Sequence, residues 1–319
     1  MIKEIGGYLE YESYSGMEYH ENALGVNSGR NALLYLLRAL DIKRLWIPYY
    51  ICDSVIAVCE NEGVQISYYQ IDAELKPILP YEASMECLLI VNYFGQLTNE
   101  DIGNAKRRSN IVIVDNTQAF FARPVENCYS FYNCRKFFGV PDGAYLYTDR
   151  LLRVELPIAY SHQNLAYLAG RFEVDGKSFY DGFRNNEKRI SAEPLRLMSQ
   201  LTHNLLKVID YEKVKTTRED NFQYLHERLG GINRLKLKVP MGPYMYPLYC
   251  ENGSLLRKHL IDLRIYVPVF WPEVLRGMSS NKFEYDLANN LLPLPVDQRY
   301  GITDMRQIVD VMMTGVERN

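Results

Sequence analysis

A lysine at position 136 lies in a segment rich in aromatic residues, SFYNCRKFFGVPDGA, which occupies residues 130–144. Arg135 precedes this lysine directly. Burial among aromatic side chains and a neighbouring cation both lower the pKa of a lysine, and such a lysine can form a Schiff base with a carbonyl group. Arg135 stays protonated and cannot take that role. Lys136 is therefore a candidate nucleophile, and an ordinary surface lysine is the alternative.

A second candidate group is the carboxylate of Asp115, which follows the four apolar residues 111–114. The apolar run predicts a buried strand, and a carboxylate at its end is unfavourable unless it meets a cation or hydrogen-bond donors. A protonated pyridine nitrogen would be such a partner. A helix cap or an ordinary loop residue is the alternative interpretation.

A third segment begins a helical pattern with Ser28 and Gly29. The first backbone N–H groups of a helix have no partner within the helix, and the helix dipole adds positive potential there. Both properties attract a phosphate group to the start of this helix. A plain helix cap by Ser28 is the alternative.

The amino-terminal half of the chain, which carries these segments, alternates between helix and strand patterns. Helices are predicted over residues 31–40 and 99–108, with another capped by Asp53 and stopped by Gly63. Strands are predicted over residues 45–47, 65–71, 88–94, 111–115 and 144–148. This alternation predicts an α/β fold with a mostly parallel sheet covered by helices. Ligands bind at the carboxyl ends of the strands in such sheets.

The pattern changes after about Glu187 and predicts a smaller α+β domain. The expected elements are helices over 194–209 and 218–229, strands over 235–239 and 244–249, and helices that begin at Ser254 and Thr303. We therefore expect a large cofactor-binding domain with an N-terminal arm over residues 1–204, and a small C-terminal domain over residues 205–319.

The order and spacing of the motifs resemble the sugar aminotransferases of the DegT/DnrJ/EryC1/StrS family, a branch of the fold-type I pyridoxal phosphate (PLP) enzymes. The matching segments are Ser28–Leu33, Asn92–Gln96, Asp115–Ala119, Ser130–Phe131, Lys136 and Gly143–Ala144. The likeness extends to Gly6–Tyr8 near the start and Leu294–Tyr300 near the end, so it covers most of the chain.

The resemblance implies a PLP cofactor and a role for each matching residue. Lys136 would hold PLP as a Schiff base and then move the proton, while Asp115 would keep the pyridine nitrogen protonated. Gln118 would meet the ring hydroxyl. The groups that would hold the phosphate are Gly29, Arg30, Asn31 and Ser130. The family's reaction takes an amino group from glutamate or glutamine to a keto sugar on a nucleotide, in pathways such as polysaccharide biosynthesis.

The chain departs from the family pattern at several of these positions. Arg30 stands where a threonine is usual, and Ala144 replaces the second glycine of a pair. The spacing from Ser130 to Lys136 is six residues rather than five. The aromatic residue that stacks on the cofactor ring falls near Tyr50, although counting back from Gly63 points to Cys52, which cannot stack as an aromatic.

The resemblance also implies a homodimer with a shared active site. The strip of residues 184–191 precedes the predicted helix at Pro194, where the family carries an Asn-x-Arg-like motif. Asn186 and Arg189 fit this motif best, and Asn186 would reach the PLP phosphate of the partner. A solvated, charged loop is the alternative interpretation of the strip.

The composition excludes several other classes of protein. The 36 basic and 39 acidic residues nearly cancel, so no nucleic-acid partner is expected. The longest apolar stretches are too short to span a membrane and the first residues lack the apolar run of a signal peptide, so a cytoplasmic protein is expected. None of the six cysteines stands in a Cys-x-x-Cys pair, so no metal site is expected.

Three other functions are open on the sequence alone. A sugar dehydratase of the same family would use pyridoxamine and carry histidine at the lysine position, so Lys136 argues against it. A PLP-fold protein that has lost catalysis and binds or regulates is compatible with Arg30 and Cys52. An unrelated nucleotide-binding protein is remote, because the chain has neither a Gly-x-Gly-x-x-Gly nor a Walker-type loop.

Overall fold

A large sheet of eight strands organises most of the computed structural model, which describes residues 5–80 and 85–317. The strand order is β1-β8-β7-β6-β5-β2-β3-β4. Strands β7, β6, β5, β2 and β3 run parallel, whereas β8 is antiparallel to both of its neighbours and β4 is antiparallel to β3. The strands are β1 Leu24–Val26, β2 Arg44–Pro48, β3 Gln65–Ile71, β4 Pro77–Ile78, β5 Met85–Val91, β6 Ser109–Asp115, β7 Tyr129–Asn133 and β8 Ala144–Tyr147.

Three helices pack on this sheet and begin where local chemistry places them. Helix α1 (Gly29–Ala39) packs on β7 and β8, α2 (Asp53–Asn61) on β3, and α3 (Asn99–Lys106) on β6. The Ser28 hydroxyl accepts the N–H of Asn31 at 3.2 Å and so caps α1. Thr98 and Asp101 form a reciprocal capping box at the start of α3. Each of these two caps fixes the residue at which its helix begins.

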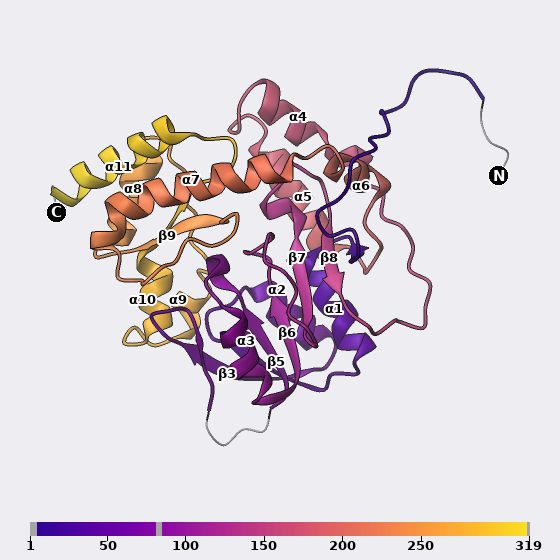
Figure 1. Ribbon diagram of the computed structural model, residues 1–319, viewed down its shortest axis with the longest axis horizontal. Helices are drawn as coiled ribbons and strands as arrows, with labels where there is room; N and C mark the ends of the chain where they lie inside the picture. The colour runs from indigo at the N-terminus through magenta and orange to yellow at the C-terminus, as the bar shows by residue number, and fades with distance from the viewer. Residues whose placement is uncertain (1–4, 81–84, 318–319) are drawn as a thin grey trace.

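The C-terminal third of the chain builds a second layer around a two-stranded sheet, β9 (Met245–Tyr249) and β10 (Leu291–Pro295). Its helices are α7 Tyr211–Leu229, α8 Gly253–Asp262, α9 Val274–Gly277, α10 Phe283–Asn290 and α11 Ile302–Glu317. These elements share an apolar cluster that includes Phe222, Leu248, Leu260, Leu292 and Met305. Figure 1 shows this layer, in orange and yellow, beside the carboxyl-end side of the large sheet.

The predicted fold class is confirmed, because a mostly parallel eight-stranded sheet accompanies a smaller α+β layer. A domain boundary at residue 205 stays a prediction. In the described part of the chain, no helix combines the length and the apolar character that a membrane span requires.

Two sequence predictions about the middle and C-terminal parts of the chain are wrong, and so is the alternative interpretation of residues 184–191 as a loop. Residues 194–199 are not helical, and α6 covers only Gln200–Leu206. The reason is that Leu197 bridges to Val26 and Ile158 in extended conformation. The strip expected as a possible loop lies in a helix, α5 (Tyr180–Ala192), which follows α4 (Ala166–Glu173). Residues 235–239 form no strand.

His20 is buried within an aromatic cluster on the large sheet, and this burial has a consequence for stability. Its ring lies 4.2 Å from that of Tyr132 and 4.8 Å from that of Phe120, between centroids. The Nε2 atom lies 2.8 Å from the carbonyl oxygen of Phe120, so Nε2 carries the proton and donates. Burial lowers the pKa of His20 from 6.5 to about 4.

The protein is therefore expected to lose stability as the pH falls from 6.5 towards about 4. In that window the unfolded chain takes up a proton at His20 that the folded chain does not, which lowers the free energy of unfolding by about 1.4 kcal/mol per pH unit. Urea unfolding at pH 7 and pH 5 measures the difference. The variant His20→Gln keeps a hydrogen-bond donor for the carbonyl oxygen of Phe120 but has no group that titrates in this range. Between pH 7 and pH 5 its free energy of unfolding should therefore fall by about 2 kcal/mol less than that of the wild type. An equal loss in both proteins would contradict the assignment.

Candidate active site

Lys136 and Asp115 come together at the carboxyl ends of β7 and β6. A short 3₁₀ turn, Cys134–Lys136, follows β7 directly and carries the lysine. The Nζ atom of Lys136 donates to Thr117 Oγ1 at 3.0 Å, and the backbone N–H of Thr117 donates to Asp115 Oδ1 at 2.8 Å. Thr117 thus links the amine to the carboxylate. The position agrees with the general rule for ligand sites in parallel sheets.

Burial and mutual attraction set the protonation of this pair. Burial lowers the pKa of Lys136, and the Asp115 carboxylate opposes that shift in part. Burial likewise raises the pKa of Asp115, against the attraction of Lys136. A lowered lysine pKa increases the fraction of neutral amine near neutral pH, which is the form that attacks a carbonyl carbon. A buried carboxylate of raised pKa is stabilised by any cation that comes to lie against it.

The start of α1 lies beside this pair because Gly29 has no side chain. A Cβ atom there would lie 3.3 Å from Thr117 Cγ2 and 3.6 Å from Asn133 Nδ2. The Oδ1 atom of Asn133 accepts the N–H of Arg135 at 2.9 Å, while among the described residues its Nδ2 group makes no hydrogen bond. The helix start, Thr117 and Asn133 therefore form a cradle of donors next to Lys136.

Two of the predicted phosphate ligands send their side chains elsewhere. The guanidinium of Arg30 donates to the carbonyl oxygens of Ile190 and Glu193 at 3.1 Å each, at the end of α5. The side chain of Asn31 donates to Asn27 and to the carbonyl oxygens of residues 193 and 194. Arg30 and Asn31 therefore contribute only backbone N–H groups to the start of α1. The N–H of Asn31 already donates to the hydroxyl of Ser28.

Ser130 lies on the face of β7 opposite to the cradle. Side chains alternate along a strand, so Ser130 shares a face with Tyr132, which packs on His20, whereas Asn133 lies at the strand end beside Gly29. Ser130 is fully buried, and its Oγ has no hydrogen-bond partner among the described residues. Sequence reasoning missed Asn133, although the six-residue spacing from Ser130 to Lys136 was a signal that the family register had shifted.

Gln118 and the pair Tyr50 and Cys52 border the site in different ways. The Oε1 atom of Gln118 accepts the N–H of Phe94 at 3.1 Å and supports that residue in its left-handed conformation, φ 52°. Tyr50 is fully buried, with its ring 4.5 Å from that of Trp271 at 74°, so it packs in the core. Cys52 is half-buried and directly precedes α2, where its Sγ lies 3.2 Å from the hydroxyl of Ser54.

Two residues from the C-terminal layer border Lys136 or the residue after it, and sequence reasoning did not find them. The ring centroid of Tyr244 lies 5.7 Å from Lys136 Nζ. The buried guanidinium of Arg218, on α7, donates to the carbonyl oxygen of Phe137 at 3.2 Å and to that of Pro243 at 2.8 Å. These bonds tie the segment after Lys136 to the C-terminal layer. Neither residue stands in a motif, because long-range packing alone brings them to the site.

Asn186 is used within its own chain. It is 2% exposed, and its amide donates to the carbonyl oxygen of Pro141 at 2.9 Å and to the hydroxyl of Tyr167 at 3.1 Å. Arg189 donates to its Oδ1 at 3.0 Å and forms an ion pair with Glu193. In this arrangement Asn186 holds α5 against the turn that precedes β8, and it presents no free amide at the surface.

The Asn133 side chain is expected to contribute to the affinity for PLP through the phosphate. Asn133→Ala should weaken PLP binding about tenfold, the size of one hydrogen bond to a charged group. Absorbance titration with PLP measures it, and pyridoxal, which lacks the phosphate, should bind equally to both proteins. Ser130→Ala is the matched control and should leave affinity unchanged. The reverse pattern would mean that Ser130, not Asn133, meets the phosphate.

Comparisons with known proteins identify the fold that holds this site. No protein-family model matches the sequence, and no curated protein matches it either. Solved structures match over nearly the full chain. A DegT DnrJ EryC1 StrS aminotransferase from Brucella abortus is 14% identical with a TM-score of 0.62, covering 92% of this chain and 85% of that one.

Two further solved structures match the chain to a similar extent. The PLP form of a putative sugar aminotransferase, Spr1654 of Streptococcus pneumoniae, is 13% identical with a TM-score of 0.64, covering 93% of this chain and 87% of that one. NtdA of Bacillus subtilis with bound PMP is 14% identical with a TM-score of 0.64, covering 96% and 78%. The chain has the fold of the DegT/DnrJ/EryC1/StrS sugar aminotransferases, as its motifs predicted.

Proposed function

We propose that the protein is a PLP-dependent aminotransferase that moves an amino group from glutamate or glutamine to a keto sugar, carried on a nucleotide. The observation that carries this proposal is the half-buried Lys136 beside the buried Asp115, at the carboxyl ends of neighbouring parallel strands. Two solved structures of the same fold hold PLP or PMP, Spr1654 of Streptococcus pneumoniae in its PLP form and NtdA of Bacillus subtilis with bound PMP. The pairing of Lys136 with Asp115 and, among the described residues, the free donors at the start of α1 and at Asn133 support binding of that cofactor.

Each group of the site has a place in this chemistry. Bound PLP supplies a ring that accepts the electrons of a carbanion next to its nitrogen. Asp115 would face the ring nitrogen and keep it protonated, and the amide of Gln118 would donate to the ring hydroxyl. The helix start at Gly29, with Asn133, would hold the phosphate. The amine of Lys136 would anchor the cofactor and move a proton between the substrate carbon and the cofactor.

The experiment that tests the proposal follows absorbance of the purified protein with PLP as glutamate is added, and then supplies keto-sugar nucleotides. We expect a change of the cofactor spectrum with glutamate, formation of 2-oxoglutarate, and recovery of the first spectrum with one of the keto sugars. A protein that binds no PLP, or whose PLP spectrum ignores both glutamate and glutamine, would contradict the proposal.

A second candidate function is a PLP-fold protein without amino transfer, which binds or regulates. The observation that favours it is the orientation of Arg30, whose side chain caps α5 instead of meeting the phosphate. This candidate predicts PLP binding with no spectral response to amino donors. Lys136 argues against a third, a pyridoxamine-dependent dehydratase.

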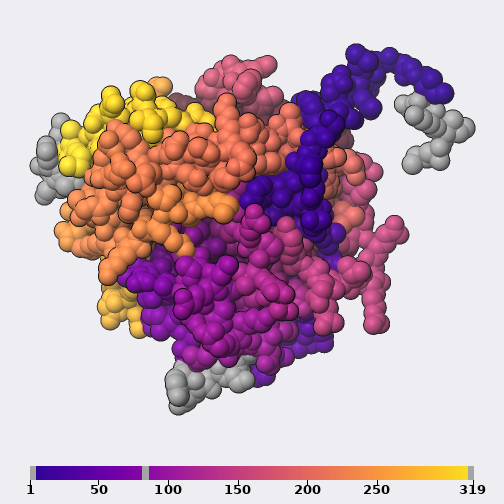
Figure 2. Space-filling view, in the orientation of Figure 1, coloured from indigo at the N-terminus to yellow at the C-terminus, as the bar shows by residue number. Residues whose placement is uncertain are grey.

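A homodimer is part of the proposal, and an exposed apolar arm supports it. Residues 5–11 extend away from the body of the molecule in Figures 1 and 2. Ile5, Tyr8 and Leu9 are more than 90% exposed, which is unfavourable for a lone chain. The arm would pack on a second copy. A cytoplasmic location is also proposed, since all six cysteines are free thiols.

Replacing the three apolar residues of the arm with serine should weaken the dimer about a hundredfold or more, because each buried apolar side chain contributes on the order of 1.5 kcal/mol or more. Sedimentation velocity across a concentration series measures the shift. Ile261→Ser, at an exposed position on α8, is the control and should leave the dimer intact. A wild-type protein that sediments as a monomer at all concentrations would contradict this part of the proposal.

A further inference from the structure

The carbonyl oxygen of Phe137, the residue directly after Lys136, is held from the C-terminal layer. It accepts the Nε2 amide of Gln298 at 2.8 Å and the Nη2 group of Arg218 at 3.2 Å. Arg218 lies on α7, and Gln298 follows β10. A carbonyl oxygen has two lone pairs, and here each receives a donor from a different segment. The end of the turn that carries the lysine is therefore fixed to this layer.

Arg218 holds a second segment at the same time. Its Nη1 group donates to the carbonyl oxygen of Pro243 at 2.8 Å and to that of Tyr244 at 3.3 Å. The side chain is only 1% exposed, and in the described part of the chain its hydrogen bonds all go to neutral oxygen atoms. Burying a charge without an opposite charge beside it is unfavourable for stability, which favours a role of Arg218 in positioning these segments.

The ring of Tyr244 lies over the amine of Lys136. Its centroid is 5.7 Å from Nζ, within the range of a cation–π interaction, which stabilises the charged amine. The Tyr244 ring is stacked at 14° on that of Phe270, with centroids 6.2 Å apart, and lies 5.5 Å from that of Phe137. The guanidinium of Arg218 lies 4.7 Å from the centroid of the Phe137 ring. Arg218 thus holds both the backbone of Tyr244 and a ring against which Tyr244 packs.

Other groups around the lysine also bear on its charge. Burial lowers the pKa of Lys136 most, and Arg135, on the same turn, adds to this effect. Asp115 at the end of β6 and Cys52 before α2 oppose it. The Tyr244 ring acts in the same direction as Asp115, because it too favours the charged amine. Its contribution comes from the C-terminal layer and so depends on how that layer packs beside the turn.

We propose that Arg218 is a positioning residue that keeps the ring of Tyr244 over the amine of Lys136. The packing of the C-terminal layer thereby sets the balance between the charged amine and the neutral form that attacks a carbonyl carbon. The proposal rests on the proposed function only in taking Lys136 as the reacting amine. The planar fork of a guanidinium holds the carbonyl oxygens of Phe137, Pro243 and Tyr244 together, and the ammonium group of a lysine cannot reproduce this geometry.

The test measures the pKa of Lys136 in the full-length protein without PLP and without an amino donor. The protein is labelled with a trace of acetic anhydride over a series of pH values, with free phenylalanine as the reference amine. Mass spectrometry of the peptide that contains Lys136 gives the fraction of neutral amine at each pH. Tyr244→Leu should lower the pKa of Lys136 by at least about 0.4, the size of a weak cation–π contact. Tyr244→Phe keeps a ring and should leave the pKa unchanged.

Arg218→Lys keeps the positive charge but not the fork. We expect it to lower the pKa of Lys136 as Tyr244→Leu does. In the double variant Arg218→Lys/Tyr244→Leu the pKa should fall no further than in Tyr244→Leu, because Arg218 acts through the ring. Arg228→Lys, at an exposed position on the same helix, is the matched control and should leave the pKa of Lys136 as in the wild type.

Gln298→Met decides the question if Arg218→Lys does not fold, since it removes a donor to Phe137 from a half-buried position. It should lower the pKa of Lys136 in the wild type but not in Tyr244→Leu. An unchanged pKa in Tyr244→Leu, or effects of the two sites that simply add, would overturn the proposal. Because PLP and donor are absent, this result is separate from amino transfer. Failure of amino transfer with the expected pattern of pKa values would count against the proposed reaction alone.

Discussion

Replacing Lys136 with alanine is expected to lower the rate of amino transfer about 10⁴-fold, because the variant loses both the covalent anchor of PLP and the group that moves the proton. The fold should persist, since the substitution removes a buried amine whose pKa burial already lowers. The measurement is the formation of 2-oxoglutarate from glutamate in a single turnover, with PLP at saturation.

Lys188→Ala provides the control for this experiment, because Lys188 is an exposed lysine on α5. Its rate should equal that of the wild type. A Lys136→Ala protein that retains more than a tenth of the wild-type rate would show that another group carries the chemistry.

Replacing Asp115 with asparagine is expected to slow amino transfer about a thousandfold, while the fold stays intact. An asparagine oxygen can still accept the N–H of Thr117, as Asp115 Oδ1 does at 2.8 Å. What the variant loses is the negative charge against the ring nitrogen, and the loss of one electrostatic contact to the reacting system is typically worth 10²- to 10³-fold. Solvent and substrate deuterium effects on the single turnover measure proton transfer directly.

A second readout separates this role from a structural one. Removing the charge should shift the pH at which the spectrum of bound PLP changes, because the carboxylate no longer stabilises a protonated ring nitrogen. Asp142→Asn is a useful comparison, since Asp142 accepts the N–H of Ser199 at 3.0 Å away from the lysine. That variant should change stability but not the PLP spectrum. A near-normal rate in Asp115→Asn would mean that Asp115 only caps the turn at Thr117.

Local patterns were sufficient to predict most of the large sheet. The strand β3 was predicted with its observed bounds, because its seven residues favour strands and a glycine with φ +67° precedes them closely. Helix α1 was predicted because its apolar residues recur at helical spacing after Ser28. The pattern failed at residues 194–199, whose apolar side chains also recur at helical spacing. Pairing of Leu197 with two distant residues overrides that preference.

The neighbourhood of Lys136 and Asp115 could be predicted from motif order, but the direction of several side chains could not. A shift of one residue along a strand moves a side chain to the other face of the sheet. The six-residue spacing therefore leaves Ser130 on the far face and brings Asn133 to Gly29. The guanidinium of Arg30 follows the carbonyl groups at the end of α5, which only the folded chain brings close.

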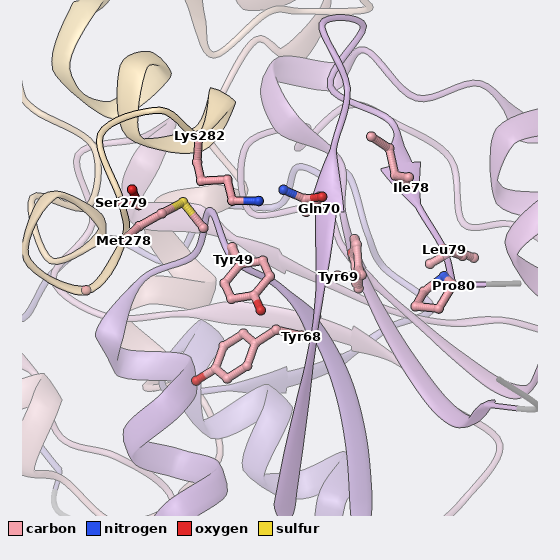
Figure 3. Close-up of a pocket in the computed structure, with 11 residues that line it drawn as sticks. Tyr49, Tyr68, Tyr69, Gln70, Ile78, Leu79, Pro80, Met278, Ser279 and Lys282 are labelled. Atoms are coloured by element: carbon pink, nitrogen blue, oxygen red, sulfur yellow. The ribbon is translucent and has the colours of Figure 1, made fainter. Parts of the chain in front are cut away.

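Contacts between distant segments account for what the sequence could not indicate. Arg218 lies 81 residues from Phe137 along the chain, and their hydrogen bond exists only because the C-terminal layer packs beside the lysine. Likewise, a pocket lined by Tyr49, Tyr68 and Lys282 lies between two strands and a segment more than two hundred residues later in the chain (Figure 3). Neither arrangement leaves a periodic pattern, because single side chains from separate elements make it.

One measurement tests the central claim of a Lys136-bound PLP most directly. The purified protein is incubated with PLP, reduced with borohydride and digested, and the peptide that carries the reduced cofactor is sequenced by mass spectrometry. The buried amine at the carboxyl end of β7 predicts a single labelled peptide, with the cofactor on Lys136 and none on Lys136→Ala. Label on another lysine, or no label in a protein saturated with PLP, would contradict the account.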